Sequence, residues 1–406
     1  MAAAHRLHPH VILLTSAIAI VLAFQAPGQA NALTLAVNSP ADLEDAFPGN
    51  GLCSANLAAG GPCTLRAAIT ESNALPTIEK IIVPANTYTL THANGDLDVT
   101  DDVGIDGVAG ATFIDGNGSD RVFDIDPNGI GISVTIVDVR IQNGDAPDQG
   151  GGIRNQGDLT LREVTVADNS AGNDGGGIYN TDGASLTLTG TTVSSNQTAP
   201  GQGHDGGGIF NSEGGVLNTG GNSVITANTA GNFGGGLHNS DDSDATIDDT
   251  TISGNASEMG GGLFNSGDAD LTLLNTAVTE NAAHRGGGVS NWGRLTLTNT
   301  AVSGNAAEVS GGGVYNTGEA VLSGVTIDAN PAATGGGIYT NGSMTLNNGT
   351  VTGNGGVGGA GGIQNGINGT LTLTGSTVGN NTSGGGTGGV RNDGTLTATD
   401  TTISFN

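Results

Sequence analysis

Residues 174–196 read DGGGIYNTDGASLTLTGTTVSSN, and variants of this stretch recur along the chain. Ten copies of the Gly-Gly-aliphatic element follow one another at intervals of 24 to 31 residues. A repeat of this length is typical of a solenoid, in which each repeat folds as one coil and stacks on the next. The aliphatic residues of the ten copies are Ile153, Ile178, Ile209, Leu237, Leu263, Val289, Val314, Ile338, Ile363 and Val390.

Within each repeat, apolar and polar residues alternate. Residues 186–189 read LTLT, and the same pattern returns in LTLLNTAVTEN at 271–281 and in LTLTNTAVSGN at 295–305. This alternation predicts strands with one buried face, whereas no repeat carries the 3.6-residue apolar period of a helix. Leucine-rich repeats have a denser leucine pattern, and propeller blades are longer. The sequence therefore predicts an all-β parallel β-helix (solenoid), with about ten regular coils from residue 150 onward.

A single coil cannot be stable alone. In residues 174–196 we expect Ile178, Leu186, Leu188 and Val193 to point inward, and burying each gains about 2 kcal/mol. Ordering the repeat costs at least about 1 kcal/mol per residue. Stacking has to supply the difference, through hydrogen bonds between coils and burial of the apolar faces.

Two asparagines per repeat are predicted to form ladders along the stack, because asparagine tolerates sharp turns and its amide can bond to the coils above and below. The first ladder comprises Asn155, Asn180, Asn211, Asn239, Asn265, Asn291, Asn316, Asn365 and Asn392. The second comprises Asn169, Asn196, Asn228, Asn255, Asn281, Asn305, Asn330, Asn354, Asn381 and Asn406.

The two ends of the solenoid differ. Residues 63–74 read CTLRAAITESNA and place Leu65, Ala68 and Ile69 at helical spacing, which predicts a short N-terminal capping helix. Irregular first coils are expected at 78–90, 103–105 and 113–114. At the other end the chain stops within a repeat, so we expect an uncapped or truncated end that is open to self-association.

The chain begins with the pattern of a secretory signal peptide. His5 and Arg6 precede an apolar run at 11–24, and a small-x-small sequence ends at Ala32. We therefore assign residues 1–32 to a signal peptide cleaved after Ala32. The mature chain is expected to be secreted or to lie on the extracellular face of the cell surface or outer membrane, with no later transmembrane segment.

The charge of the chain bears on its partners, and its cysteines bear on its disulfide bonds. The formal net charge of −28 repels nucleic acid, so no nucleic-acid partner is expected. The two cysteines, Cys53 and Cys63, lie ten residues apart in a chain predicted to be exported, which favours one local disulfide.

Two families share motifs with this chain. Residues 51–90 resemble the CSLREA domain of exported bacterial β-helix proteins in Cys53, in CTLRAAI at 63–69, in NA at 73–74, and in Pro84 with TYTL at 87–90. The GGGIYN and VSSN units resemble the GGA[ILV] and FxxN repeats of chlamydial polymorphic outer-membrane proteins. These resemblances imply a capping region at 33–96, a right-handed parallel β-helix at 97–406 and a surface shaft or adhesin, and they imply no particular reaction.

Few sequence motifs support a catalytic function. NTDG at 180–183 resembles an element of the polygalacturonases and makes Asp182 a weak candidate, with His204, Asp205 and His238 as further material. The companion motifs of those enzymes include Arg-x-Lys, and this chain has no lysine after Lys80. Other repeats also carry an acidic residue just after the motif asparagine, as a solvated turn would.

An acidic run offers a weak metal candidate. Asp241, Asp242 and Asp244 could hold Ca²⁺ through carboxylate oxygens, but the run lacks a calcium-loop pattern and a solvated turn is the alternative. We otherwise expect no cofactor.

The residue after each repeat aliphatic is often aromatic. Aligned coils would bring these rings into an outer stripe that could stack on sugar rings. The alternative is that neighbouring rings only cover one another and stiffen the rod. The outward threonines also suggest ice binding as a hypothesis. Ice binding needs a regular array of threonines, and residues 216–226 interrupt that array. The predicted stripe comprises Tyr179, Phe210, Phe264, Tyr315 and Tyr339.

Together these observations predict a non-catalytic secreted or cell-surface protein that is adhesin-like or a structural shaft, with glycans or cell-surface components as partners. The alternative is a polysaccharide-active enzyme, of the pectin lyase or glycoside hydrolase kind, on the same scaffold.

Overall fold

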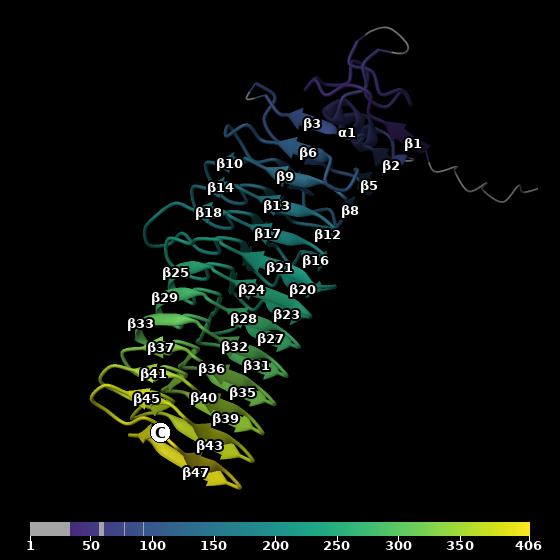
Figure 1. Cartoon of the computed structure of the whole chain (residues 1–406). Helices are drawn as coiled ribbons and strands as arrows, with labels where there is room; N and C mark the ends of the chain where they lie inside the picture. The colour runs from purple at the N-terminus through teal and green to yellow at the C-terminus, as the bar shows by residue number, and fades with distance from the viewer. Residues whose placement is uncertain (1–32, 57–60, 77, 92) are drawn as a thin grey trace, which may run out of the picture. The chain divides into compact units, whose positions relative to one another are not determined.

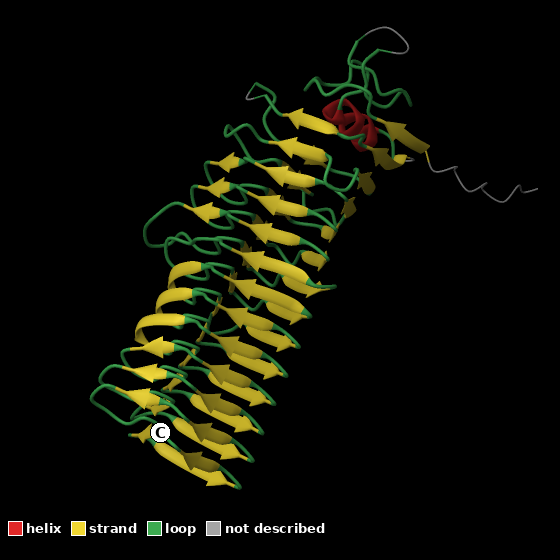
Figure 2. Ribbon diagram, viewed as in Figure 1, coloured by secondary structure: helices red, strands yellow, loops and turns green. Residues whose placement is uncertain are grey.

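A computed structural model describes residues 33–56, 61–76, 78–91 and 93–406. These residues form a right-handed parallel β-helix, as the repeats predict, and the stacked coils carry three long parallel sheets (Figures 1 and 2). The predicted signal peptide at 1–32 lies outside the described residues.

Sheet A carries the strands of the LTLT type. Its inward residues include Leu186 and Leu188, which are 0% and 1% exposed. In stack order its strands are β1 (Leu33–Ala36), β2 (Ile78–Ile82), β5 (Val103–Asp106), β8 (Ser133–Val137), β12 (Asp158–Arg162), β16 (Ser185–Thr189), β20 (Val216–Gly220), β23 (Asp244–Asp248), β27 (Asp270–Leu274), β31 (Arg294–Thr298), β35 (Glu319–Ser323), β39 (Ser343–Asn347), β43 (Thr370–Thr374) and β47 (Thr395–Thr399).

Sheet B follows sheet A in each coil after a tight turn. Each regular strand buries one central aliphatic residue, such as Val193. Its strands are β3 (Asn86–Thr89), β6 (Thr112–Asp115), β9 (Arg140–Gln142), β13 (Thr165–Ala167), β17 (Thr192–Ser194), β21 (Ser223–Thr226), β24 (Thr250–Ser253), β28 (Ala277–Thr279), β32 (Ala301–Ser303), β36 (Thr326–Asp328), β40 (Thr350–Thr352), β44 (Thr377–Gly379) and β48 (Thr402–Ser404).

From β11 onward, the strands of sheet C follow the glycine-rich elements. Its strands are β4 (Leu97–Val99), β7 (Phe123–Ile125), β11 (Ile153–Asn155), β15 (Ile178–Asn180), β19 (Ile209–Asn211), β22 (Leu237–Asn239), β26 (Leu263–Asn265), β30 (Val289–Asn291), β34 (Val314–Asn316), β38 (Ile338–Thr340), β42 (Ile363–Asn365) and β46 (Val390–Asn392).

Between sheets B and C, short strands form three small sheets. They comprise β10 (Asp145–Ala146), β14 (Ser170–Ala171) and β18 (Gln197–Thr198); β25 (Ala256–Met259), β29 (Ala282–Arg285) and β33 (Ala306–Ser310); and β37 (Pro331–Ala332), β41 (Gly355–Gly356) and β45 (Thr382–Ser383).

The glycines before each sheet C strand serve two different purposes. Gly206 has a φ of 62°, in the left-handed region that favours glycine. A Cβ atom on Gly208 would lie 2.6 Å from the carbonyl oxygen of Gly236 in the next coil. A side chain there would push the coils apart, so the sequence needs glycine at both positions.

Both asparagine ladders are formed by hydrogen bonds between coils. In the first, the amide of Asn155 donates to Asn180 Oδ1 over 2.7 Å, and the pattern repeats along sheet C. Thr340 takes the place of one member and accepts from Asn316 over 3.1 Å. In the second ladder, each asparagine oxygen accepts both the backbone and the side-chain N–H of the asparagine one coil earlier, from Asn169 through to Asn406.

The N-terminal end carries the helix α1 (Leu65–Ala74) where the sequence predicts a capping helix (Figure 2). Thr64 caps it by accepting the N–H of Ala67 over 3.0 Å, and α1 contacts β2 and β4. Cys53 and Cys63 form the predicted disulfide. The sequence analysis missed β1, which precedes the helix in the chain and pairs with β2.

The second ladder gives a first prediction. Asn281 donates to Ile252 O over 3.0 Å and to Asn305 Oδ1 over 2.9 Å, and its oxygen accepts two bonds from Asn255. Asn281→Ala removes these four bonds and leaves the buried backbone N–H of Asn255 without its acceptor. We therefore expect the free energy of unfolding to fall by about 3 kcal/mol in urea denaturation.

The matched control is Asn347→Ala, at a half-buried position on the outer face of sheet A. We expect this change to cost less than about 0.5 kcal/mol. Equal losses in the two variants would contradict the stabilising role of the ladder.

Candidate functional site

One outward-pointing column runs along sheet C. It consists of the middle residue of each three-residue strand, whose flanking residues point into the core in all but the last strand. The strands pair without register shifts, so these residues lie above one another from the first coil of the sheet to the last. We call this set the outer column: Asp98, Asp124, Arg154, Tyr179, Phe210, His238, Phe264, Ser290, Tyr315, Tyr339, Gln364 and Arg391.

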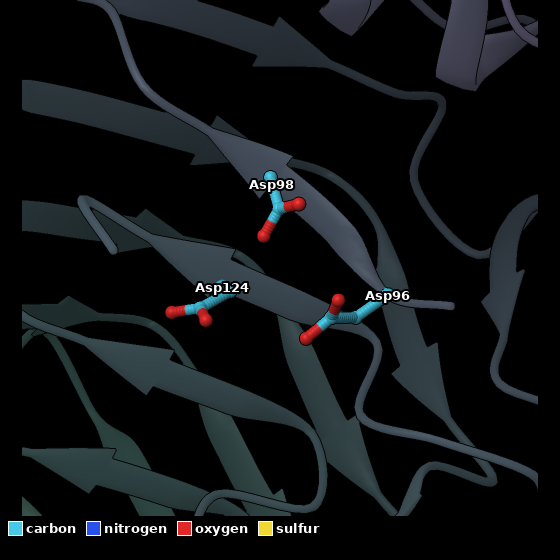
Figure 3. A group of neighbouring side chains, drawn as sticks. All are labelled: Asp96, Asp98 and Asp124. Atoms are coloured by element: carbon cyan, nitrogen blue, oxygen red, sulfur yellow. The ribbon is translucent and has the colours of Figure 1, made fainter. Parts of the chain in front are cut away.

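The N-terminal part of the outer column is charged. Asp98 on β4 and Asp124 on β7 lie beside Asp96, and ligand atoms of the three carboxylates all lie within 4.8 Å of one another (Figure 3). Arg154 Nε donates to Asp124 Oδ1 over 3.0 Å. Arg121, which is 6% exposed, donates to Asp96 Oδ2 over 3.0 Å. The two guanidinium groups offset much of the negative charge of the cluster.

The proximity of the carboxylates changes their acidity. Partial burial raises the pKa of Asp98 to about 6, with further contributions from the charges of Asp96 and Asp124. Burial also raises the pKa of Asp96, against the opposing effect of Arg121. Because Asp98 as a residue is exposed, solvent screens the effect of its charge on stability.

The acidic side chains that lie close together in the structure are not the ones that the sequence offered as metal ligands. In the described part of the chain, Asp96, Asp98 and Asp124 form the one group of at least three acidic, histidine or cysteine side chains close enough to share an ion. Asp241, Asp242 and Asp244 are exposed and do not form such a group, because Asp241 and Asp242 have φ near +55° in a turn that separates them from Asp244 on β23. Arginines already bind Asp96 and Asp124, which opposes a cation there.

Aromatic rings occupy the middle of the outer column. Tyr179 and Phe210 stack with ring centroids 5.5 Å apart, and Phe210 meets His238 edge-on at 4.8 Å. His238 in turn meets Phe264 at 4.9 Å. Rings at this separation attract each other beyond simple burial.

Two rings outside the outer column cover its centre. Phe233, in the loop before β22, stacks on Phe264 at 4.4 Å, and Trp292, just after β30, approaches Phe264 edge-on at 5.0 Å. Phe264 is therefore 1% exposed. Phe210 lies between Tyr179 and His238 and is 8% exposed. The predicted sugar stacking does not hold for Phe264 and Phe210, because so little of either ring is exposed.

The remaining rings of the predicted stripe stay accessible. Tyr179, Tyr315 and Tyr339 are half-buried, and Tyr315 stacks on Tyr339 at 5.2 Å with planes 6° apart. Burial raises the pKa of Tyr179 and of Tyr315, so both phenols remain neutral hydrogen-bond donors at physiological pH. Trp292 is 42% exposed and adds an accessible indole beside the outer column.

Asp182 lies in a turn, as expected if the acidic residues after the motif asparagines belong to solvated turns. The residue is exposed with a φ of 57°, and its carboxylate accepts a hydrogen bond from Gln156 Nε2. Asp182 and Asp158 both line a shallow hollow of about 530 Å³ at the edge between sheets C and A.

Some members of the site were missed by the sequence analysis. Asp98 and Asp124 lie in irregular coils without the glycine-rich element, yet LDV at 97–99 and FDI at 123–125 share the buried-outward-buried pattern of IRN at 153–155. That three-residue pattern could have found them. Phe233 and Trp292 lie outside the aligned position and carried no comparable pattern.

Comparisons with known proteins add the following findings. No protein-family model and no curated protein matches the chain. The solved structure of the periplasmic alginate epimerase AlgG is similar with a TM-score of 0.46 at 11% identity, over 80% of this chain and 76% of that chain. PfbA, a surface adhesin of Streptococcus pneumoniae, is similar with a TM-score of 0.36 at 12% identity, over 84% of this chain and 87% of that chain. The resemblances to the CSLREA domain and to the chlamydial repeats stay predictions.

Among the described residues, no helix combines the length and the apolar character that a membrane-spanning helix requires.

The raised pKa of Asp98 gives a second prediction. Its folded-state value of about 6 lies above the ordinary 3.8, so the stability from its protonation is fully present below pH 3.8 and is lost as the pH rises to about 6. Asp98→Asn removes this loss. We expect the melting temperature of the variant to exceed that of the wild type by about 2 °C at pH 7, and the difference to shrink at pH 4.

Asp158→Asn serves as the control, because it neutralises an exposed carboxylate on β12 outside the cluster. The same gain in both variants would show that net charge, and not the cluster, is responsible.

Proposed function

We propose that the protein is secreted or displayed at the cell surface and binds polysaccharide along the outer column, in an adhesin-like role. The observation that carries this proposal is the position of Tyr179, Tyr315 and Tyr339 in the one outer column of sheet C, with the exposed Trp292 beside that column. A linear polymer can contact successive coils, since the coils repeat about every 4.8 Å.

The chemistry of the outer column suits sugars. Tyrosine and tryptophan rings stack on the apolar faces of sugar rings, and phenols, carboxylates and guanidinium groups bind hydroxyls. The net charge of −28 disfavours strongly acidic polymers. We therefore favour neutral polysaccharides as partners, and we propose that binding requires no metal, Ca²⁺ included.

Export is part of the proposal. The predicted signal peptide and the resemblance to exported β-helix proteins support it, and the disulfide suits an oxidising compartment. Mass spectrometry of the protein recovered from cells that express the full gene tests it. A mature chain beginning at Leu33 is the expected result, whereas an intact Met1 would contradict it.

The alternative is a polysaccharide-active enzyme, and one observation favours it. Asp158 and Asp182 line a single hollow, and pairs of carboxylates act in glycoside hydrolysis. Incubation with a panel of polysaccharides, followed by assays for new reducing ends and unsaturated products, decides between the two. Turnover that Asp182→Ala abolishes would establish the enzyme.

A third prediction tests glycan binding. We expect Tyr315→Ala combined with Tyr339→Ala to weaken binding on a glycan array at least tenfold, because each lost ring–sugar contact is worth about 1 kcal/mol. Melting curves of the variant check that the fold survives. EDTA is expected to leave the binding of the wild type unchanged.

The matched control is Phe47→Ala, which removes a ring that is 55% exposed and lies far from sheet C in the chain. This variant should bind like the wild type. Absence of wild-type binding to every glycan, or equal losses in both variants, would overturn the proposal.

A further inference from the structure

Three polar residues meet at the centre of the outer column in a way that glycan binding does not use. They come from consecutive coils: Asp205 from the loop before β19, His238 from β22, and Ser266 from the turn directly after β26. The residues lie 28 to 61 positions apart in the chain, so only the stacking of the coils brings them together.

Their geometry places a histidine between a hydroxyl and a carboxylate. His238 Nε2 lies 2.9 Å from Ser266 Oγ. His238 Nδ1 lies 3.4 Å from Asp205 Oδ2, without the alignment of a hydrogen bond. A carboxylate at this position favours the proton on Nδ1, which leaves Nε2 free to accept from the serine hydroxyl. Contacts of this kind are often long before substrate binds.

The carboxylate is itself held in place. Asp205 Oδ1 accepts the N–H of Phe233 over 3.0 Å, and the N–H of Asp205 donates to Asp174 Oδ1 over 2.9 Å. The Asp205 side chain is 14% exposed. It therefore faces His238 from a fixed position.

The imidazole is held by the rings around it. Phe210, Phe233 and Phe264 surround His238 with centroid distances of 4.8, 5.8 and 4.9 Å. The side chain of His238 is 5% exposed, whereas Ser266 is half-buried and reaches the surface. A shielded base beside an accessible hydroxyl is the arrangement that activates a serine nucleophile.

We propose that Asp205, His238 and Ser266 act as a triad that hydrolyses esters, with O-acylated sugars as the substrate class. This activity goes beyond the proposed binding function, and it requires no metal or redox cofactor.

The reaction runs in two halves. Ser266 Oγ attacks the acyl carbon while His238 Nε2 takes the hydroxyl proton, and Asp205 stabilises the resulting imidazolium. The C–O bond to the sugar breaks, and the sugar oxygen leaves as an alcohol with the proton from Nε2. Water then attacks the acyl-serine, giving its proton to Nε2. The carboxylic acid is released and Ser266 regains its proton.

The surroundings of Ser266 leave room for such a substrate. A Cβ atom built on Gly267 would have no other heavy atom within 4 Å, so the space beside the serine is open. Within the described residues, the backbone N–H groups of Gly267 and Asp268, directly after Ser266 in the chain, have no protein acceptor and are available as donors beside the serine. The proposed reaction requires such donors for the oxyanion. Trp292 follows in the next coil and offers an accessible face for the sugar ring.

Ser240 provides a matched comparison one coil earlier. It occupies the position of Ser266 in the repeat, but it is 4% exposed and donates to Asp241 Oδ2 over 2.9 Å. The outer-column residue one coil before it is Phe210, which cannot act as a base. Ser240 therefore has the same residue type and backbone position without the triad.

The experiment treats the whole purified chain with a fluorophosphonate, whose phosphorus is attacked by an activated serine with loss of fluoride. Peptide mapping by mass spectrometry is expected to locate the adduct on Ser266. Ser266→Ala should abolish labelling and lower the hydrolysis of p-nitrophenyl acetate at least about 100-fold, while Ser240→Ala should match the wild type in both. Asp205→Asn, which keeps an acceptor for Phe233, should slow both reactions at least about tenfold.

Several results would overturn the proposal: no adduct on the wild type, an adduct on another serine, or equal effects of Ser266→Ala and Ser240→Ala. Melting curves check that each variant folds. Because the small ester and the fluorophosphonate need no glycan, these results do not depend on the glycan array, and failure of either proposal leaves the other standing.

Discussion

The stacking of parallel coils in a fixed register is the constraint on which the other features depend. Every backbone N–H and C=O of a sheet strand bonds to the coil above or below, so a given position faces the same position in its neighbours about 4.8 Å away. A residue must suit both of those neighbours. Asparagine at the turns suits both neighbours because it bonds to the asparagines of the adjacent coils, as Asn281 does with Asn255 and Asn305. Gly208 suits them because it has no side chain and leaves room for the backbone of the next coil.

The same register builds the functional face. Outward residues that are 24 to 31 positions apart become direct neighbours, so a moderate preference at one repeat position becomes a continuous outer column. Residues in the loops before and after the sheet C strands then decide which members of the column reach solvent. Phe233 and Trp292 cover Phe264, whereas Tyr315 and Tyr339 stack on each other and stay half-buried. Loop composition thus controls which rings of the column are accessible.

Buried charge occurs at the N-terminal end, where the coils are irregular. Arg66 on α1 donates to Asp42 Oδ1 over 2.6 Å and to the carbonyl of Asp96 over 2.6 Å, which ties the cap to the first coils. Arg121 does the same between Asp96 and the following coils. Buried ions need such partners to remain charged. The N-terminal coils are therefore held together by specific ion pairs, whereas the regular coils are held together by the asparagine ladders. Burial and the neighbouring carboxylates raise the pKa of Asp98 in this region, and the charges of Arg66 and Arg121 oppose that rise.

The sequence by itself determined the features that repeat: the coil, the inward residues such as Ile178 and Leu188, both asparagine ladders and the turn at Asp182. It also indicated the helix at 65–74, because the helical spacing of Leu65, Ala68 and Ile69 is a local pattern. The tertiary structure alone decided that β1 pairs with β2, that Phe264 is covered, and that Asp205, His238 and Ser266 meet. These depend on loop paths and on side chains from different coils, which no local pattern encodes. Periodicity predicts which backbone positions stack, but the contacts that depart from the period are fixed only when the coils pack.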